Sequence, residues 1–264
     1  MKRIISFITI ICLMFLIGCS SSMHFRYKDS DKYSIGEASF DVKDVKKIKI
    51  EWAGTNALIS SYEGETIHIY EDLDEGTSDK YKLHYYLNND TLYIEPCASM
   101  MFPQFNFHTK VLHVEIPNTL TMDNLELFDL ELVSTSGTVS GVNAQKVDID
   151  SVSGNLTISA ITSDEVDIDA VSGSITIDTI TAKKIDIDTT SGAVAINNIV
   201  GSVDLDTVSG TIDIYIADGT GFEFEKIECI SGSIENEFGT LKQGDAIVKY
   251  NIDTVSGNIT IHKN

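Results

Sequence analysis

The chain has 264 residues, of which 42% are hydrophobic, and a formal net charge of −21 at pH 7. A surface this acidic repels nucleic acid and anionic lipid headgroups, so the composition excludes both as direct partners. The chain has 40 acidic residues against 19 lysines and arginines. This charge balance favours solvated acidic faces, divalent cations or cationic partners.

Residues 1–18 indicate an export signal. Lys2 and Arg3 precede an apolar run, Ile4–Ile17, that is too short for a comfortable membrane span. The run leads into Leu16-Ile-Gly-Cys19, which matches the bacterial lipobox, in which the cysteine is lipidated and becomes the first mature residue. We therefore expect an extracytoplasmic protein held on the cell membrane by lipid at Cys19. An uncleaved anchor and an ordinary cleaved signal are the alternatives.

Two regions precede the repeats. Residues 19–32 are polar and predict a short tether above the membrane. Residues 33–129 alternate apolar and polar side chains, as in Lys47–Trp52, and Tyr81–Leu87 with Thr91–Glu95 predicts a hairpin across an Asn-rich turn. We expect this region to be a β-rich cap that covers the open edge of the first coil.

Two features of the cap and the cysteines stay open. Ala98–His108 is apolar and aromatic without a period, which fits either a loop packed on the cap or an exposed apolar surface. Cys12 leaves with the signal, so Cys97 and Cys229 remain. Cys229 occupies a repeat position held elsewhere by small residues, and we expect a packed free thiol there. Cysteines and histidines show no metal-binding spacing.

One motif recurs through residues 130–264. Val147-Asp-Ile-Asp-Ser-Val-Ser-Gly-Asn-Leu-Thr-Ile158 returns in near-copies at Val166–Ile177, Ile185–Ile196, Val203–Ile214 and Tyr250–Ile261. A period of roughly 18 residues predicts an all-β fold, a parallel β-helix of about seven coils. Seven Ser-Gly pairs mark the expected corners, at Gly137, Gly154, Gly173, Gly192, Gly210, Gly232 and Gly257.

The repeat also predicts which positions face the interior. Two residues after each glycine stand aliphatic residues such as Leu156 and Ile175, and two residues before it stand residues such as Val152 and Val171. We expect both sets to stack as interior columns. The last repeat ends close to Asn264, so we expect little material for a C-terminal cap.

The repeats resemble the bacterial "putative-adhesin" family, a domain of unknown function in bacterial envelope proteins. Val147-Asp-Ile-Asp-Ser-Val-Ser-Gly154, the strand ending at Trp52, Tyr33–Phe40 and Lys82–Leu87 carry the likeness. The resemblance implies a β-helical extracytoplasmic protein, in some members tied to envelope-stress responses, and it implies no reaction.

Acidic residues precede the corner glycines at two fixed positions. Stacking predicts two outward columns, with Glu131 assigned to the column six residues before the glycines. The face consists of Asp148, Asp167, Asp186 and Asp204 beside Asp150, Asp169, Asp188 and Asp206, with Glu228 and Asp253 continuing the second column. It can be a solvated face, a calcium-binding face or a receptor for a cationic peptide or envelope protein. The calcium-roll pattern of paired glycines is absent from the sequence.

No catalytic constellation is visible in the sequence. Arg26 is the only arginine after residue 18, His262 is the only histidine of the repeats, and the repeat serines have no histidine partner. We expect a non-enzymatic protein without a cofactor that acts through surface binding, in envelope-stress sensing or in protection against cationic peptides. The alternatives are a surface adhesin or structural envelope protein and, more remotely, a carbohydrate-active β-helix enzyme.

Overall fold

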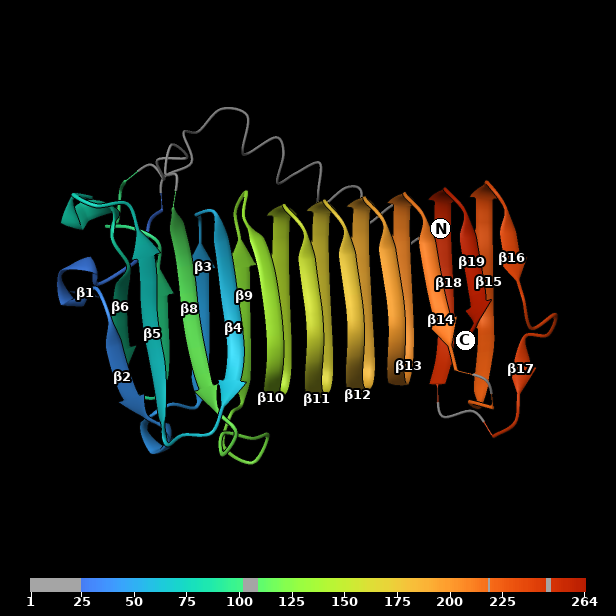
Figure 1. The fold of residues 1–264 in the computed structure, drawn as a ribbon, viewed down its shortest axis with the longest axis horizontal. Coiled ribbons are helices and arrows are strands. Elements are labelled where there is room, and N and C mark those ends of the chain that lie inside the picture. Colours follow the sequence, from blue (N-terminus) through green and yellow to red (C-terminus); the bar gives the residue numbers. More distant parts are fainter. Residues whose placement is uncertain (1–24, 102–108, 218, 246–247) are drawn as a thin grey trace.

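The structure, a computed structural model, describes residues 25–101, 109–217, 219–245 and 248–264. It is all-β and largely parallel, with an antiparallel N-terminal region, and the strands stack along one long axis (Figure 1). Within the described ranges, no helix is long and apolar enough to cross a membrane. Cys19 and residues 102–108 of the apolar Ala98–His108 segment lie outside these ranges.

Four long strands form the middle of the stack. They are β10 (Ser136–Ser153), β11 (Leu156–Ser172), β12 (Ile175–Ser191) and β13 (Val194–Ser209). Each pairs in parallel with the next, and the register places like residues side by side, as in Asp148, Asp167 and Asp186. The expectation of a parallel repeat stack is therefore confirmed.

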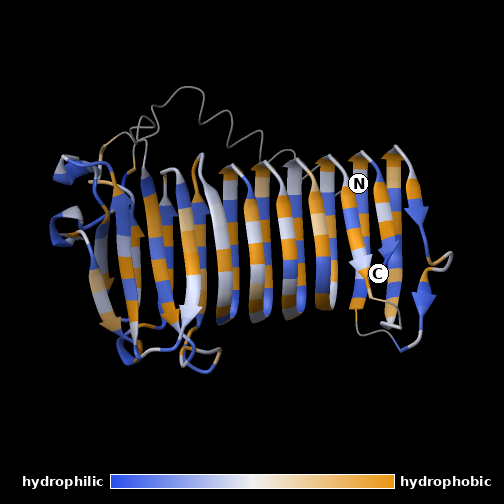
Figure 2. Cartoon of the chain, viewed as in Figure 1, coloured by the Kyte–Doolittle hydropathy of each residue, from blue (hydrophilic) through white to orange (hydrophobic). Residues whose placement is uncertain are grey.

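The long strands bend because their inward phase changes along each repeat. In β11 the buried positions are Leu156 and Ile158, then Ile161 and Ser163, and then every second residue from Val166. Alternation within a segment gives one buried face, and each change of phase marks a corner. Figure 2 shows the resulting bands of apolar and polar residues running across the strands.

One predicted interior column is wrong. Val152 is 39% exposed and Ile230 is 68% exposed, and the equivalent residues of the other coils are partly exposed. The exception is Thr135, which is buried because Gly137 pairs with Leu156 and so is out of step with the other glycines. The alternation that starts at Val147 continues without a break, which points Val152 outward beside Asp148 and Asp150. The position before it is the buried one, and small residues fill it: Ser151, Ala170, Thr189, Thr207 and Thr254.

Most of the Ser-Gly corners need glycine for its backbone freedom. Gly154, Gly173, Gly192, Gly210, Gly232 and Gly257 all have φ between 114° and 151°, whereas Gly137 has no positive φ. A Cβ at Gly173 would also overlap the carbonyl oxygen of Gly154 in the coil below. Backbone conformation and stacking distance therefore exclude a side chain at this corner.

The C-terminal coils do not stack in chain order. The strands are β14 (Ile212–Ile216), β15 (Phe222–Ser231), β16 (Ile234–Asn236), β17 (Lys242–Gln243), β18 (Val248–Ser256) and β19 (Ile259–Lys263). β18 lies between β13 and β15, and β19 lies between β14 and β16. The last repeat in the sequence, β18 and β19, therefore stacks between the two repeats that precede it in the chain. This order is possible because similar repeats present similar edges.

This order supplies a C-terminal cap that we did not expect. The segment 236–243 turns back over the outermost coil, and β17 pairs antiparallel with Phe222 and Glu223. Phe238 packs against the core, with its ring centroid 4.8 Å from that of Phe222. The prediction that little material remains for a cap is therefore wrong.

The N-terminal region contributes both cap and first rungs. Its elements are η1 (Ser30–Lys32), β1 (Ser34–Ile35), β2 (Ala38–Asp41), η2 (Val42–Asp44), β3 (Lys47–Trp52), β4 (Asn56–Tyr62), β5 (Thr66–Leu73), η3 (Asp79–Tyr81), β6 (His84–Asn88), β7 (Thr91–Glu95), β8 (Lys110–Pro117) and β9 (Leu127–Leu132). β6 and β7 form the predicted hairpin. The β3 strand pairs in parallel with β7 and β9, and β9 pairs with β10, so the parallel stack already begins at β7.

Contacts at Lys110 and at Phe25 fix the cap internally. The Lys110 ammonium donates to Glu71 Oε2 at 2.7 Å and to the Tyr81 carbonyl at 2.9 Å, and lies 4.6 Å from the Trp52 ring centroid. At the start of the described chain, the Phe25 N–H donates to the Met101 carbonyl at 3.2 Å, and Phe25 is buried. Phe25, inside the expected tether, is thus packed on the cap, whereas residues 28–32 are exposed.

Candidate binding face

Two parallel columns of side chains run along one face of the stack. The mixed column consists of Lys49, Asp129, Asp148, Asp167, Asp186, Asp204, Asn251 and Lys226. The carboxylate ladder consists of Glu51, Glu131, Asp150, Asp169, Asp188, Asp206, Asp253 and Glu228. Neighbouring rungs in such a stack are about 4.8 Å apart.

The register corrects one assignment and adds residues that we missed. Glu131 pairs with Asp150 and so belongs to the ladder, whereas Asp129 pairs with Asp148. Glu51 extends the ladder into the cap because it pairs with Glu131. The Lys-Ile-Lys-Ile-Glu pattern of β3 has the same alternation as Val-Asp-Ile-Asp, and this signal could have revealed the extension.

Lysines pair with several aspartates of the mixed column. Lys49 Nζ lies 2.6 Å from Asp129 Oδ2, and Lys184 Nζ lies 3.0 Å from Asp186 Oδ2. The Asn251 amide donates to Asp204 Oδ1 at 2.8 Å. A further lysine, Lys146, lies 3.2 Å from Asp148. Three aspartates of this column therefore have a lysine within 4.0 Å, and Asp204 has an amide donor.

The carboxylate ladder lacks such neutralisation along its middle. Among the residues that the structure describes, no lysine or arginine lies within 4.0 Å of the carboxylates of Asp150, Asp169 or Asp188. Only at the C-terminal end does Lys226 pair with Asp253 and Glu228. Asp169 Oδ1 is also buried without a hydrogen-bond partner.

Burial and mutual repulsion raise the pKa values of the ladder. At Asp150, Asp169, Asp188 and Asp206, desolvation is the larger cause, and the neighbouring carboxylates add to it. The pKa rises to about 7 at Asp150 and Asp188 and to about 6 at Asp169 and Asp206. We therefore expect these four rungs to exchange protons near neutral pH, with each titration influenced by its neighbours.

The ladder ends in a buried carboxyl pair at the cap. Glu95, on β7 beside β3, is 6% exposed. Burial, followed by the charge of Glu51, raises the pKa of Glu95, and burial together with Glu131 raises that of Glu51. Glu95 Oε2 has no hydrogen-bond partner in the described structure. At this end of the ladder, burial therefore favours the neutral form of the two carboxyl groups, Glu51 and Glu95.

The remaining candidate groups do not converge on a reaction site. His262 stacks on Tyr215 at 4.4 Å between centroids, and its Nε2 lies 3.1 Å from Asp213 Oδ1. Cys97 and Cys229 are both free thiols. Burial raises the pKa of Cys97 to about 12, which disfavours the nucleophilic thiolate. The Cys229 Sγ donates to the Gly257 carbonyl at 3.1 Å.

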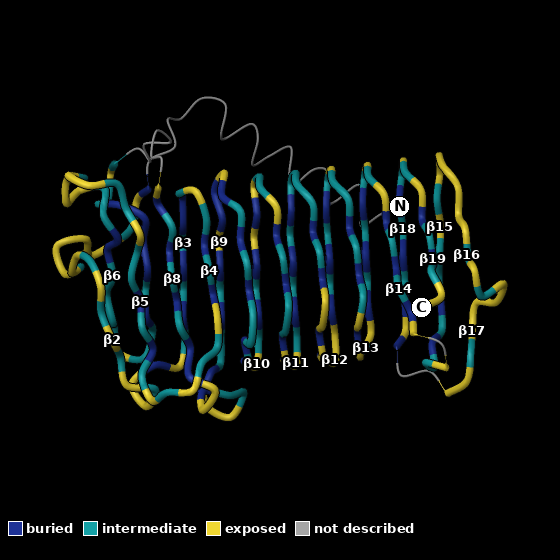
Figure 3. The backbone as a smooth tube through the Cα atoms, viewed as in Figure 1, coloured by how far each residue is buried: buried dark blue, intermediate teal, exposed yellow. Residues whose placement is uncertain are grey.

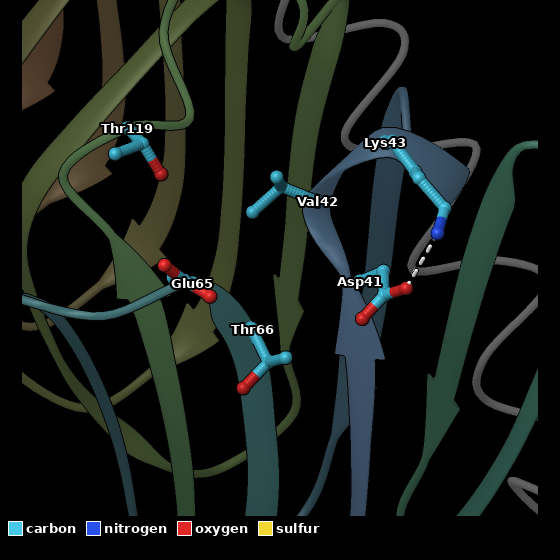
Figure 4. A pocket seen from close by; sticks show the side chains of 6 residues that line it. All are labelled: Asp41, Val42, Lys43, Glu65, Thr66 and Thr119. Atoms are coloured by element: carbon cyan, nitrogen blue, oxygen red, sulfur yellow. Dashed lines mark hydrogen bonds and ion pairs between the residues drawn. The ribbon is translucent and has the colours of Figure 1, made fainter.

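A surface pocket of about 350 Å³ lies on the cap (Figure 4). It is lined by Asp41, Val42, Lys43, Glu65, Thr66 and Thr119. Lys43 Nζ turns to Asp41 Oδ2 at 2.8 Å, so its charge is already paired. In the described ranges, no group of three or more His, Cys, Asp or Glu residues is arranged to hold a metal ion. The ladder remains the distinctive chemical feature of the molecule.

Fold and face together define a parallel β-stack with an N-terminal antiparallel cap and one carboxylate-lined face. The chain belongs to the family described as Toastrack DUF4097, whose sequence pattern matches residues 45–264. No curated protein matches the chain.

Crystal structures from three bacteria resemble it. One from Bacteroides fragilis, described as a "putative adhesin", is 14% identical with a TM-score of 0.52, covering 87% of this chain and 97% of that one. A structure from Parabacteroides distasonis, described in the same words, is 15% identical with a TM-score of 0.46, covering 91% of this chain and 100% of that one. Another from Parabacteroides merdae is 14% identical with a TM-score of 0.45, covering 90% of this chain and 99% of that one. At these identities the likeness concerns the fold alone.

Proposed function

We propose that this protein is a non-enzymatic, adhesin-type binding protein whose carboxylate ladder recognises a cationic partner. The observation that carries the proposal is the row of ladder carboxylates without lysine partners between Asp150 and Asp188. The adhesin description of the Bacteroides fragilis structure, which shares the fold, supports adhesion as the biological setting. Sensing of cationic peptides, or protection against them, would use the same chemistry.

The physical basis is the relief of repulsion. Burial, and after it the charge of the neighbouring carboxylates, disfavours the charged form of each rung and raises the pKa values. An ammonium or guanidinium group placed over two rungs favours the charged form, so binding releases protons and replaces repulsion with charge-assisted hydrogen bonds. The stacked strands hold the rungs in a fixed register, which lowers the entropic cost of ordering the site.

Titration calorimetry with a lysine-rich peptide tests this proposal. The variant changes Asp167, Asp169, Asp186 and Asp188 to Asn. The matched control changes Asp164, Asp178, Asp213 and Glu165 to their amides, which removes the same charge outside the two columns. We expect the parent and the control to bind with an affinity that falls steeply with salt, and the variant to lose at least about tenfold. Equal binding by variant and control would refute the proposal.

Calcium is the competing ligand for the same face. If the ladder holds calcium, the ion raises the melting temperature of the parent by mass action but not that of the four-residue variant. If the ladder instead binds a cationic partner, we expect no calcium-dependent difference between the two proteins.

We also propose that Cys19 carries the lipid that places the protein on the outer face of the cell membrane, because Leu16-Ile-Gly-Cys19 matches a lipobox. Metabolic labelling with a fatty acid should mark the parent and not Cys19→Ala. Equal labelling of the two proteins would refute the anchor and leave the binding proposal untouched.

A further inference from the structure

The outermost coil presents an unpaired strand edge. One edge of β15 pairs with β18. On the other edge, β17 pairs only with Phe222 and Glu223, and the Phe224 N–H donates to the Leu241 carbonyl at 2.8 Å. Within the described part of the chain, the backbone from Lys226 to Ser231 has no strand on that outer side. Such an edge is a ready template for another strand.

Exposed apolar side chains gather at the same end. Ile230, Ile234 and Leu241 are 68%, 44% and 52% exposed. They account for three of the seven exposed large hydrophobic residues in the described chain. Figure 3 shows the end strands β16 and β17 as mostly exposed, in contrast to the middle of the stack.

The charge balance at this end also differs from that of the rest of the stack. Residues 222–264 contain seven acids and four lysines, whereas residues 130–216 contain thirteen acids and three lysines. On the free edge itself, Lys226 and Glu228 alternate in sign, and their side chains are 36% and 68% exposed. A second copy of the chain therefore meets less repulsion here than along the carboxylate ladder.

We propose that this edge is an interface between two copies of the chain, related by a two-fold axis, with the free stretches of β15 paired antiparallel. In a pairing centred on Ile227, Lys226 of each copy faces Glu228 of the other, so the edge is complementary to itself. Ile230 of each copy then lies opposite Phe224 of the other, next to the exposed Leu241 that borders Phe224, so the contact covers these two exposed apolar side chains. The hairpin that contains β17 limits the contact to a few residues, which predicts a weak, concentration-dependent dimer.

The edge meets the C-terminal end of the ladder, because Glu228 is the last rung there. The ligand-binding proposal rests instead on the rungs from Asp150 to Asp188, so dimerisation and ligand binding can fail independently. Sedimentation velocity on the full-length protein, from about 1 μM to about 1 mM, measures the association. The variant Ile230→Lys with Leu241→Lys should raise the dissociation constant at least about tenfold. The control Val152→Lys with Val200→Lys adds the same charge at aliphatic positions that are 39% and 44% exposed on other parts of the stack, and it should retain the dimer.

Two further measurements keep the test decisive. Glu228→Lys places like charges opposite each other without removing an apolar contact, and it should weaken the dimer even if the double variant melts early. Hydrogen exchange at the amides of residues 226–231 should slow as the protein concentration rises. A parent that stays monomeric throughout, a control that weakens association as much as the edge variants, or concentration-independent exchange would overturn the proposal.

Discussion

At the scale of a single residue, the glycine at most corners of the stack serves two physical needs. Gly173 has φ of 114°, a region that side-chain-bearing residues rarely adopt, and its missing Cβ makes room for the carbonyl of Gly154. Gly219 has φ of 85°, and no neighbouring atom lies within 4 Å of the point where a Cβ would stand. Substitutions at the two positions therefore separate the energetic cost of backbone strain from that of the stacking contact.

Gly173→Ala should lower the free energy of unfolding by about 1–3 kcal/mol. The reason is that strain and overlap with Gly154 act together, and the facing atom is backbone, which cannot move aside cheaply. Gly219→Ala, which carries the strain alone, should cost less. Urea denaturation of both variants checks this, and equal losses would mean that the stacking contact does not matter.

Lys110 is the second residue whose environment makes a sharp prediction. Its side chain is 2% exposed and pairs with Glu71, which is 7% exposed. Burial lowers the pKa of Lys110, and Glu71 opposes that shift. Truncating one partner of a buried pair leaves an uncompensated charge.

Lys110→Ala should destabilise the protein by about 3–5 kcal/mol, and Lys110→Met with Glu71→Leu should recover much of the loss because no buried charge remains. Thermal denaturation of the parent, the single variant and the double variant measures both effects. A double variant as unstable as the single one would show that packing around Trp52, rather than charge pairing, sets the cost.

At the scale of the strand, the ladder links stability to pH. A carboxyl whose pKa is raised on folding binds more protons in the folded than in the unfolded state between the two pKa values. Its stabilising contribution is therefore complete below the unfolded value, about 4, and is lost as the pH rises through the folded values of about 6 to 7. The melting temperature of the parent should fall between pH 5 and pH 8, apart from changes elsewhere in the chain.

Asp188→Asn should raise the melting temperature at pH 8 and have less effect at pH 5, because the amide mimics the protonated rung. The matched control is Asp186→Asn, two residues away in the mixed column, where the native carboxylate lies 3.0 Å from Lys184. That change removes an ion pair and should give no stabilisation at pH 8. If both variants behaved alike, the distinction between the two columns would be wrong.

Sequence periodicity predicted the strands and their register where one repeat follows another closely. It placed Asp148 beside Asp167 and the hairpin of β6 and β7 correctly. It failed at Val152, because an apolar residue beside a corner was taken to face inward, although the strand keeps its phase through Ser151. It also failed at Glu131, because spacing was counted from Gly137, which is not a positive-φ corner like the others.

At the scale of the whole molecule, stacking order was beyond sequence reasoning. The repeat ending at Ile261 resembles the repeat ending at Ile214 closely enough to pair with it, so β18 and β19 insert before β15 and β16. Only long-range pairing decides between such similar edges. The extension of the ladder into the cap through Glu51 depends on the same kind of pairing, between β3 and β9.

One property of the molecule as a whole is central to its proposed function: a row of carboxylates that takes up protons near neutral pH. Carbon-13 NMR of the aspartate carboxyl groups, titrated from pH 3 to pH 9 and assigned with single Asp→Asn variants, measures it directly. We predict transitions at about pH 7 for Asp150 and Asp188 and about pH 6 for Asp169 and Asp206. Titration of all four near their ordinary value of about 4 would contradict this prediction, because the ladder would then be an ordinary solvated face.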